Sequence, residues 1–570
     1  MSYIVIKGKL VARTAIHIGS GRADETTDAL IRRDGAGMPL IPGTAIAGAL
    51  RALATRLGPR MGAGVCAALR SPGSPEATKP CNCAVCRLFG DINPADEEGG
   101  VSMASRLLVF NGKLLAPSPG TTIRDGVGID RGTGAAARAG AVKFDLEVLP
   151  RGTGFELLME LRNHDAERDE PLLAAALAEW QAGRAWLGGR VARGLGAFDL
   201  KGLELCRLDL NDPKNLLEFL KSDEPRKITI PVKGWLSENV GGIRCIPPKE
   251  DHKEAASFIA RCWFSVEGIL QADGPFLTND TTTSSLNGFD HAPLLMKYND
   301  WKQPVLSGSS LRGVIRSHAE RLARTLATLS AADGRAFLEG CPACNPVEAN
   351  TERALPSCDS LLGDKVAGDR EVAGEQLCLA CRFFGSSRWG SRFLVEDASC
   401  VGSPQPLFKI FDFLAVDRFT GGGSHGAKFD ALCLWRPSFN LKLHVDNPEP
   451  WELGWLGLVL RELQAGWLTV GMGAAKGFGR ITLKDLRLRL GYLTGEDAQA
   501  FGLKPETGST KRKCIFHEAP IGSLSDMKDW AEAFRGKVTG FKRPTGISLE
   551  GGSDTYFNRI DHLYSRKATL

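Results

Sequence analysis

The strongest constraint on this 570-residue chain is that it carries the same motifs twice, in the same order. Residues 40–51 align with residues 305–316, and the glycines of the two segments coincide. Four further pairs follow along the chain: 83–90 with 378–385, 105–106 with 391–392, 129–134 with 416–421, and 193–196 with 476–479. Five matching blocks in series are not expected by chance, so the sequence predicts two copies of one domain.

The chain is also too long for a single hydrophobic core. We place the first copy at residues 1–205 and the second at residues 259–490. Residues 206–258 are interpreted as a linker with a small insertion. Residues 491–570 form a C-terminal extension without a counterpart in the first copy. A solvated tail and a docking or RNA-contact segment remain alternatives for this extension.

The order of elements within each copy predicts the fold class. Apolar alternation and helical periodicity give a β–α–β–β–α–β order, with a cysteine-bearing excursion after the first helix. This order predicts an α+β fold of two tandem ferredoxin-like or RRM-type domains, a common platform for RNA. We expect Thr44 to cap the first helix of copy one, and Ser309 or Ser310 to cap the equivalent helix of copy two.

Composition limits the cellular context more than the function. The 71 basic and 66 acidic residues give a net charge of +5, which neither requires nor excludes a nucleic-acid partner. No apolar run approaches the roughly 20 residues that span a bilayer, and no signal peptide is visible. The 15 cysteines are odd in number and tightly clustered. This pattern favours zinc in a reducing cytoplasm over disulfides, so we predict a cytoplasmic protein with no membrane association.

Each copy contains enough clustered cysteines for a closed tetrahedral site, the geometry that zinc prefers in structural roles. The predicted ligands of two structural Zn²⁺ sites are Cys66, Cys81, Cys83 and Cys86 in copy one, and Cys341, Cys344, Cys378 and Cys381 in copy two. Cys358 is an alternative ligand in copy two. Unligated thiols are the competing interpretation for both clusters.

Two kinds of segment could approach phosphates. The glycine-rich loops at residues 188–196 and 471–479 follow a helix and enter a strand, which excludes a dinucleotide-binding fingerprint. Their backbone could still approach RNA closely, and their cations add charge. Helix N-termini also attract phosphate, although an ordinary capped helix is nearly as good an interpretation. The candidate RNA-binding residues in these segments are Gly43, Thr44, Arg51, Gly308, Ser309, Arg316, Arg190, Arg193 and Lys476.

Two further pieces repeat. Asp28 and Asp290 lie in the same irregular loop of each copy, and a carboxylate there could bind a divalent cation. Asp24, Asp34 and Asp300 are close competitors. The two Asp-Arg-x-Thr-Gly segments lie in polar, glycine-rich stretches typical of a long projecting hairpin. They add Arg131 and Arg418 to the candidate RNA-binding residues, with a solvated hairpin as the alternative.

Taken together, these blocks resemble the RAMP superfamily, in particular the backbone subunits of type III CRISPR effector complexes. Two fused units are similar to the fused backbone proteins of subtype III-D. The resemblance implies binding of a CRISPR guide RNA and of a base-paired target RNA. It implies a thumb hairpin at about residues 122–145 and 411–430. It also implies neighbouring RAMP subunits and a large cyclase- or polymerase-type subunit as partners.

The resemblance further implies that Asp28 and Asp290 are catalytic. Cleavage in the family requires Mg²⁺ or Mn²⁺ and uses the RNA 2′-hydroxyl as nucleophile, so DNA would not be cut. Copy two departs from the pattern, because 18 positions separate Asp290 from Gly308 against 15 between Asp28 and Gly43. His291 beside Asp290 could assist proton transfer. A non-catalytic scaffold remains an alternative. A ribonuclease that matures guide precursors is a further one, although the duplication argues against it.

Overall fold

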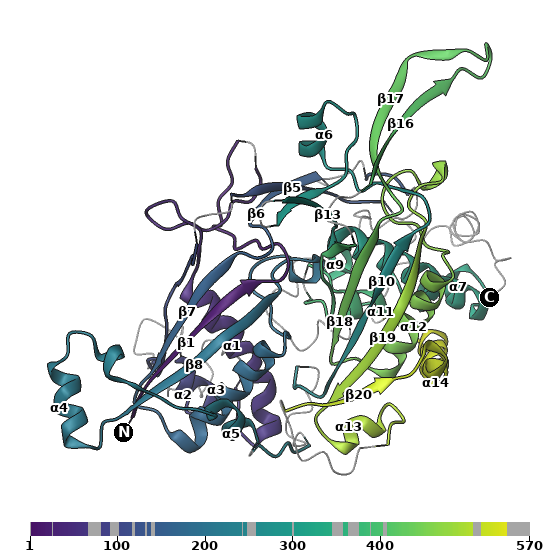
Figure 1. Ribbon diagram of the computed structural model, residues 1–570. Helices are drawn as coiled ribbons and strands as arrows, with labels where there is room; N and C mark the ends of the chain where they lie inside the picture. Colours follow the sequence, from purple (N-terminus) through teal and green to yellow (C-terminus); the bar gives the residue numbers. More distant parts are fainter. Residues whose placement is uncertain are drawn as a thin grey trace.

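The structure is a computed structural model in which two similar units of helices and strands lie side by side (Figure 1). It describes residues 2–25, 27–66, 81–91, 102–116, 120–130, 134–137, 143–241, 243–247, 258–298, 301–344, 357–362, 376–387, 389–402, 407–504 and 515–543. The duplication predicted from the sequence therefore appears directly as two sheets with equivalent helices.

The sheet of the first half is antiparallel, and its first and last long strands are neighbours. Its spatial order is β3 (Leu107–Val109), β7 (Gly154–Leu161), β1 (Ser2–Ala12), β8 (Phe198–Asp209) and the short β9 (Ile230–Pro231). A two-stranded piece, β2 (Leu40–Ile41) with β4 (Gly112–Lys113), lies beside this sheet.

The sheet of the second half repeats this order. It runs β14 (Phe393–Val395), β18 (Ser438–Asp446), β10 (Cys262–Ala272), β19 (Ile481–Tyr492) and β20 (His517–Ile521). Three strands extend it on the β18 side: β15 (Ala398–Val401), β13 (Trp301–Leu306) and β12 (Leu295–Tyr298). The short β11 (Pro275–Phe276) pairs instead with β17 (Gly423–Trp435), a strand of a separate hairpin.

Helices cover one face of each sheet and bury the apolar stripe that the sequence periodicity predicts. The first half uses α1 (Gly43–Leu57) and α3 (Ala166–Gln181), and the second uses α7 (Gly308–Ser330) and α12 (Pro450–Gln464). The two cores are centred on fully buried side chains from both layers: Ile6, Leu10, Leu50 and Leu177, then Phe264, Leu270, Ile315 and Leu460. Each half therefore has its own hydrophobic core.

The halves agree even in an irregularity of the backbone. The pairing of β1 with β8 shifts register between Lys7 and Lys9, and the pairing of β10 with β19 shifts between Glu267 and Ile269. Gly8 and Gly268 occupy the two shifts, where an added Cβ would lie 3.2 Å and 2.8 Å from a leucine of the last strand. A bulge at the same glycine in both sheets is consistent with a duplicated β-bulge.

The linker and the C-terminal extension fold onto the two halves in similar ways. The linker forms α4 (Pro213–Lys221), β9 and α5 (Trp235–Gly241), and the extension forms α13 (Gly495–Gln499), β20 and α14 (Lys528–Thr539). Trp530, Phe534 and Val538 of α14 are buried against the second core. Residues 515–543 are thus part of the folded domain rather than a solvated tail, whereas residues 544–570 lie outside the described part.

The starts of α1 and α7 differ from the predicted caps. Pro42 precedes α1 and no side chain caps it, so Thr44 lies inside the first turn. In α7 the cap is Ser307, whose Oγ accepts a hydrogen bond from the Ser310 amide. The prediction of Thr44, Ser309 or Ser310 as caps is therefore wrong, because each helix begins at the glycine that those residues follow.

A two-stranded hairpin leaves each half. In the first, β5 (Thr122–Val127) pairs with β6 (Lys143–Val148). In the second, β16 (Phe408–Val416) pairs with β17 (Gly423–Trp435), and Figure 1 shows this hairpin extending away from the body of the protein. Phe419 in its turn is 98% exposed. Arg131 lies outside the described residues, so its position beyond β5 remains a prediction.

Candidate functional site

Both candidate catalytic aspartates lie on an exposed loop that contacts the base of a hairpin. The Asp145 amide donates a 2.9 Å hydrogen bond to Asp28 Oδ2. The Asp430 amide donates an equivalent 2.9 Å bond to Asp290 Oδ2, and the Asp290 amide donates back to Asp430 Oδ1. The correspondence of Asp28 with Asp290 therefore extends from sequence order to the atoms that they contact.

A third carboxylate lies at each of these positions. Asp125 is directly opposite Asp145 across its hairpin, and Asp412 is opposite Asp430. Burial and the adjacent Asp145 raise the pKa of Asp125. Among the described residues, however, only cysteine groups bring three or more ligand atoms within 4.8 Å of one another. The acidic loops therefore supply oxygen ligands without forming a closed cation site by themselves.

Sequence reasoning missed these hairpin aspartates, although a signal was present. The tripeptide Lys-Phe-Asp occurs at residues 143–145 and again at 428–430. Its phenylalanine holds a cation of the glycine-rich loop: Arg190 lies 3.9 Å from the Phe144 ring centroid, and Lys476 lies 4.3 Å from that of Phe429. Two of the predicted RNA-binding cations thus lie beside the acidic loops.

The competing aspartates of the first loop serve local turns. Asp24 Oδ1 accepts the Thr27 amide at 2.7 Å. Asp34 Oδ1 accepts the amides of Ala36 and Met38, each at 2.9 Å. Such bonds are typical of Asx turns. Asp300, the competitor in the second loop, lies outside the described residues.

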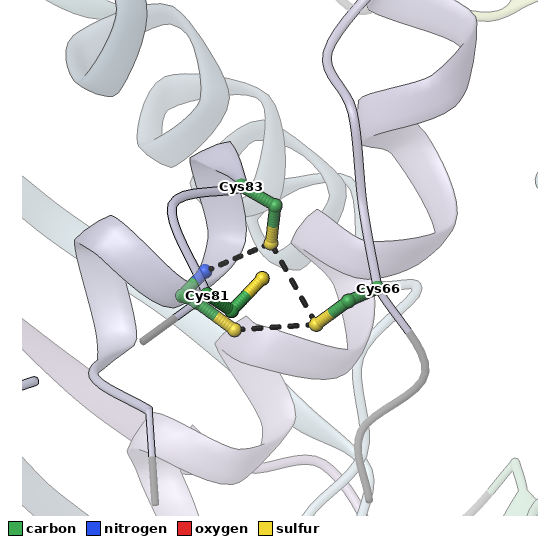
Figure 2. A group of neighbouring side chains, drawn as sticks. Cys66, Cys81 and Cys83 are labelled. Carbon is green, nitrogen blue, oxygen red and sulfur yellow. Dashed lines mark hydrogen bonds between the residues drawn. The ribbon is translucent and has the colours of Figure 1, made fainter. Parts of the chain in front are cut away.

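The first cysteine cluster consists of the four residues predicted from the sequence. The sulfur atoms of Cys66, Cys81, Cys83 and Cys86 lie within 4.8 Å of one another, and Figure 2 shows three of them pointing toward a common centre. Cys83 caps α2 (Ala84–Phe89) and its Sγ accepts the Cys86 amide at 3.4 Å. The hydrogen bond between Cys83 and Cys66 lowers the pKa of Cys83 and raises that of Cys66. Four cysteine sulfurs gathered at one position are the donor set of a structural zinc site, so this set fits zinc.

The second cluster differs from the prediction by one ligand. Its sulfur atoms belong to Cys344, Cys358, Cys378 and Cys381, and all four residues are buried. Cys358, considered only as an alternative, therefore replaces Cys341. Both tetrads offer four thiols and no open position, which is the arrangement of a structural zinc site.

The reason for this exchange lies in local structure that spacing does not reveal. Cys341 follows α8 (Gly334–Gly340), and its Sγ hydrogen-bonds the Ala343 carbonyl within its own turn at 3.2 Å. Cys358 begins α9 (Cys358–Leu362), and its Sγ accepts the Cys378 amide at 3.3 Å. Residues 357–362, which lie between Cys344 and Cys378 in the sequence, thus contribute a ligand to the cluster.

Arg51 and Arg316 were predicted to bind RNA, but the structure places them against the cysteine clusters. Arg51 Nη2 lies 3.4 Å from Cys86 Sγ, and Arg316 Nη2 lies 3.7 Å from Cys381 Sγ. Arg543, from the C-terminal extension, lies 3.8 Å from Cys358 Sγ. Guanidinium groups near a tetrathiolate offset its negative charge and orient its ligands. Their position therefore associates them with the cysteine clusters.

The two predicted helix starts are occupied by side chains of the chain itself. The Gly43 amide donates to Asn111 Oδ1, and the Gly308 amide donates to Asp397 Oδ1, both at 2.8 Å. Thr44 is exposed, whereas the Ser309 hydroxyl lies 3.1 Å from Ser307 Oγ. Gly308 is buried in the contact between the halves. Both first glycines are buried, and of the two residues that follow them only Thr44 is exposed.

Two remaining candidates lie at the surface. Arg193 belongs to the short turn η3 (Val191–Arg193) of the first glycine-rich loop. Arg418 is exposed in the turn of the second hairpin. There Asp417 Oδ1 accepts the amides of Phe419 at 2.9 Å and Thr420 at 2.7 Å. The carboxylate organises this turn, in which Arg418 is exposed.

Fold and sites together define a tandem pair of antiparallel α+β domains, each with four clustered cysteines that could hold zinc and an acidic loop beside a hairpin. The family model of the RAMP superfamily matches residues 9–199 and 292–482, and the chain belongs to this superfamily. RAMP proteins are generally CRISPR-associated, bind RNA and work in multi-subunit complexes. The comparison with curated proteins found no match. In the described part of the chain, no helix has the length and apolarity to cross a membrane.

Proposed function

We propose that this chain is a backbone subunit of a type III CRISPR effector complex that holds a guide RNA and cleaves the paired target RNA at two sites. One observation carries the proposal. Asp28 and Asp290 are exposed and make the same main-chain contact to an aspartate at the base of equivalent hairpins. Two such loops, one on each tandem domain, would contact the same target strand at two positions.

The strand order supports the finer description of the fold. In both halves the first strand lies between the third and last strands of a β–α–β–β–α–β unit, an order that supports the ferredoxin-like arrangement. The hairpins β5–β6 and β16–β17 correspond to the thumbs, which would displace one base pair each. The exposed Phe419 is suited to stack on a base at such a position. Subtype III-D fits best, because two units are fused.

The chemistry at each loop would combine an aspartate with a nearby cation. A divalent ion, Mg²⁺ or Mn²⁺, would polarise the scissile phosphate when bound. Asp28 and Asp290 would provide carboxylate oxygens at that position. Arg190 and Lys476, held on the adjacent phenylalanine rings, would attract the phosphate backbone. The nucleophile would be the 2′-hydroxyl of the RNA, which excludes DNA as a substrate.

Sequence selection would be delegated to base pairing between guide and target, so the protein needs to recognise only shape and charge. Other RAMP subunits and a large cyclase- or polymerase-type subunit would complete the complex in the cytoplasm. A scaffold that holds the two RNAs without cutting is the second candidate, because the described residues of the acidic loops form no closed cation site.

The test uses the complex assembled with a guide RNA and a labelled complementary target. Asp28→Asn and Asp290→Asn keep side-chain size and remove the charge, and Asp34→Asn is the matched control from the same loop as Asp28. We expect two cuts from the wild type in Mg²⁺ or Mn²⁺. Each single change should remove a different cut while guide binding persists. A 2′-deoxy nucleotide at a cut position should abolish that cut only.

Cuts that persist in the double variant would overturn the assignment of these aspartates. An intact complex that holds guide and target but never cuts in either metal would establish the scaffold function instead.

A further inference from the structure

A short helix in the second half has no counterpart in the first. α6 (Thr281–Asn287) lies in the loop that carries Asp290, whereas the equivalent loop of the first half contains no helix in its described residues. Asp280 caps α6 and accepts hydrogen bonds from the amide and the hydroxyl of Thr283. Gly288, with a φ of +72°, ends the helix just before Asp290. The helix is therefore part of the second acidic loop.

The start of α6 contacts the first half beside the other acidic loop (Figure 1). The Thr281 hydroxyl donates a hydrogen bond to Asp125 Oδ2, and the Thr281 amide donates to the same oxygen at 3.3 Å. Asp125 is on β5, directly opposite Asp145, whose amide holds Asp28. A line of contacts therefore leads from the second half through the hairpin β5–β6 to Asp28.

This contact is made where negative charge is concentrated. Burial, together with the carboxylates of Asp145 and Asp280, raises the pKa of Asp125. Like charges at short range repel one another, so the carboxylate of Asp125 needs donors to keep its place. The hydroxyl and the amide of Thr281 both donate to one of its oxygens. Thr281 therefore holds Asp125 on the hairpin against this repulsion.

The residue before Asp125 also ties β5 to the second half. Arg124 pairs with Asp397 at 2.8 Å, and both side chains are only 6% exposed. Successive side chains of a strand point to opposite faces, so Arg124 and Asp125 anchor β5 on both of its faces. The base of the first hairpin is therefore fixed to the second half on two sides.

The second hairpin is held differently. Strand register places Asp412 at the position of Asp125, opposite the last residue of the repeated Lys-Phe-Asp tripeptide. The side chain of Asp412 is 65% exposed, and its ion-pair partner at 3.4 Å is Lys428 of the same hairpin. The carboxylate that corresponds to Asp125 is thus paired within its own half.

We propose that Thr281 is a positioning residue for cleavage at the first acidic loop. By holding Asp125 it fixes the base of the hairpin β5–β6, whose Asp145 amide in turn orients Asp28. The proposal rests on the proposed function of Asp28 and assigns a residue of the second half to the first site. The cut at Asp28 therefore depends on both halves, whereas the cut at Asp290 does not need this contact.

The test uses the complex assembled with guide RNA and a labelled target, in which the two cuts are measured separately. Thr281→Val keeps the shape of the side chain and removes the hydroxyl. The rate of the Asp28-dependent cut at saturating target should fall about ten-fold, because catalysis is sensitive to small displacements of a reacting group. The target concentration that gives half the maximal rate should stay the same, since no charge is lost. Thr281→Ser should restore the rate, and Thr282→Val is the matched control in the same helix.

The cut at Asp290 separates a positioning role from a merely structural one. Because α6 leads directly to Asp290, damage to the helix would slow the Asp290-dependent cut as well. We expect Thr281→Val to leave that cut unchanged. An equal loss of both cuts, an unchanged first cut, or a Thr281→Ser variant that remains slow would each overturn the proposal.

A second measurement, hydrogen–deuterium exchange of the full-length protein, does not need cleavage. Thr281→Val should speed exchange in residues 143–148, which include the amide that holds Asp28, by several-fold and leave residues 423–435 unchanged. Thr282→Val should change neither segment. Unchanged exchange in residues 143–148 would show that Thr281 does not hold the first loop, even if the wild type cuts. If exchange rises as expected but the assembled wild type never cuts, the contact stands, and the cleavage function and the role of Thr281 in it are wrong.

Discussion

The two halves have the same fold and yet very different surroundings. In the second half all four metal-centre cysteines are buried, whereas in the first only Cys86 is buried and the other three are partly exposed. The second half is covered by the first half on one side and by α14 on another, and Arg543 reaches its cysteine cluster. Position in the chain, rather than the repeated motif, therefore sets how deeply each site is buried.

Glycines show the same contrast at a finer scale. Gly194 is enclosed by the second half, and its equivalent Gly477 faces open space. Asp397 is buried with Arg124, and its equivalent Asn111 is exposed. In each pair of equivalent positions one residue is buried and the other is exposed. A substitution at the exposed residue is therefore a control for the same substitution at the buried one.

The largest difference should follow loss of one metal ligand. Cys378→Ser should release zinc from the second site and destabilise the protein by on the order of 5 kcal/mol, a fraction of the total for a structural zinc site. The equivalent Cys83→Ser should cost less, because its cluster is less buried and supports less core. Zinc content and denaturant unfolding measure both effects. Equal losses would show that burial does not govern the contribution of these sites.

The next contrast depends on pH. Glu452 is fully buried beside Arg392, and burial raises its pKa from 4.5 to about 7. The folded state therefore retains a proton that the unfolded state releases. The resulting stability is complete below pH 4.5 and is lost as the pH rises through 7. Its upper limit is roughly 3 kcal/mol, from about 1.4 kcal/mol per unit.

Glu452→Gln removes this contribution. The difference in unfolding free energy between variant and wild type should therefore change between pH 4.5 and pH 7 and level off above pH 7. The equivalent position in the first half is Asp169, which binds two arginines, Arg87 and Arg106. The measurement compares the unfolding free energies of the wild type and Glu452→Gln from pH 4 to pH 8. A wild-type–variant difference that is constant with pH would contradict the assignment.

A smaller effect should separate the two glycine turns. Both Gly194 and Gly477 have positive φ, so Gly194→Ala and Gly477→Ala should each cost about 1 kcal/mol in backbone strain. Only Gly194→Ala adds a clash with Gly308, which should cost about 2 kcal/mol more. Thermal unfolding measures the difference. If Gly477→Ala were the more damaging change, the turn would be supported by contacts within its own half.

Much of this architecture follows from the sequence because repetition is a long-range signal. Element order, the first cysteine tetrad and the pairing of Asp28 with Asp290 were all readable from matched blocks. Local chemistry could not decide between Cys341 and Cys358, because the deciding factor is where a long loop returns. The pairs of Arg13 with Glu396 and Arg124 with Asp397 join residues 383 and 273 positions apart. They have no counterpart in the other copy, so comparison of the copies could not reveal them.

The smallest difference between the two halves is expected at Arg51 and Arg316. These residues occupy equivalent positions, and both approach a cysteine sulfur. Arg51→Met and Arg316→Met preserve much of the stem and remove the charge. If they act on the metal centres, each should speed zinc release from its own site by about ten-fold, as measured with a chelating dye. Arg316→Met should have the smaller effect, because Arg543 also faces the second cluster. Guide RNA affinity should stay unchanged in both, whereas Lys476→Ala should lower it. A loss of RNA affinity with normal zinc release would instead show that these arginines bind RNA.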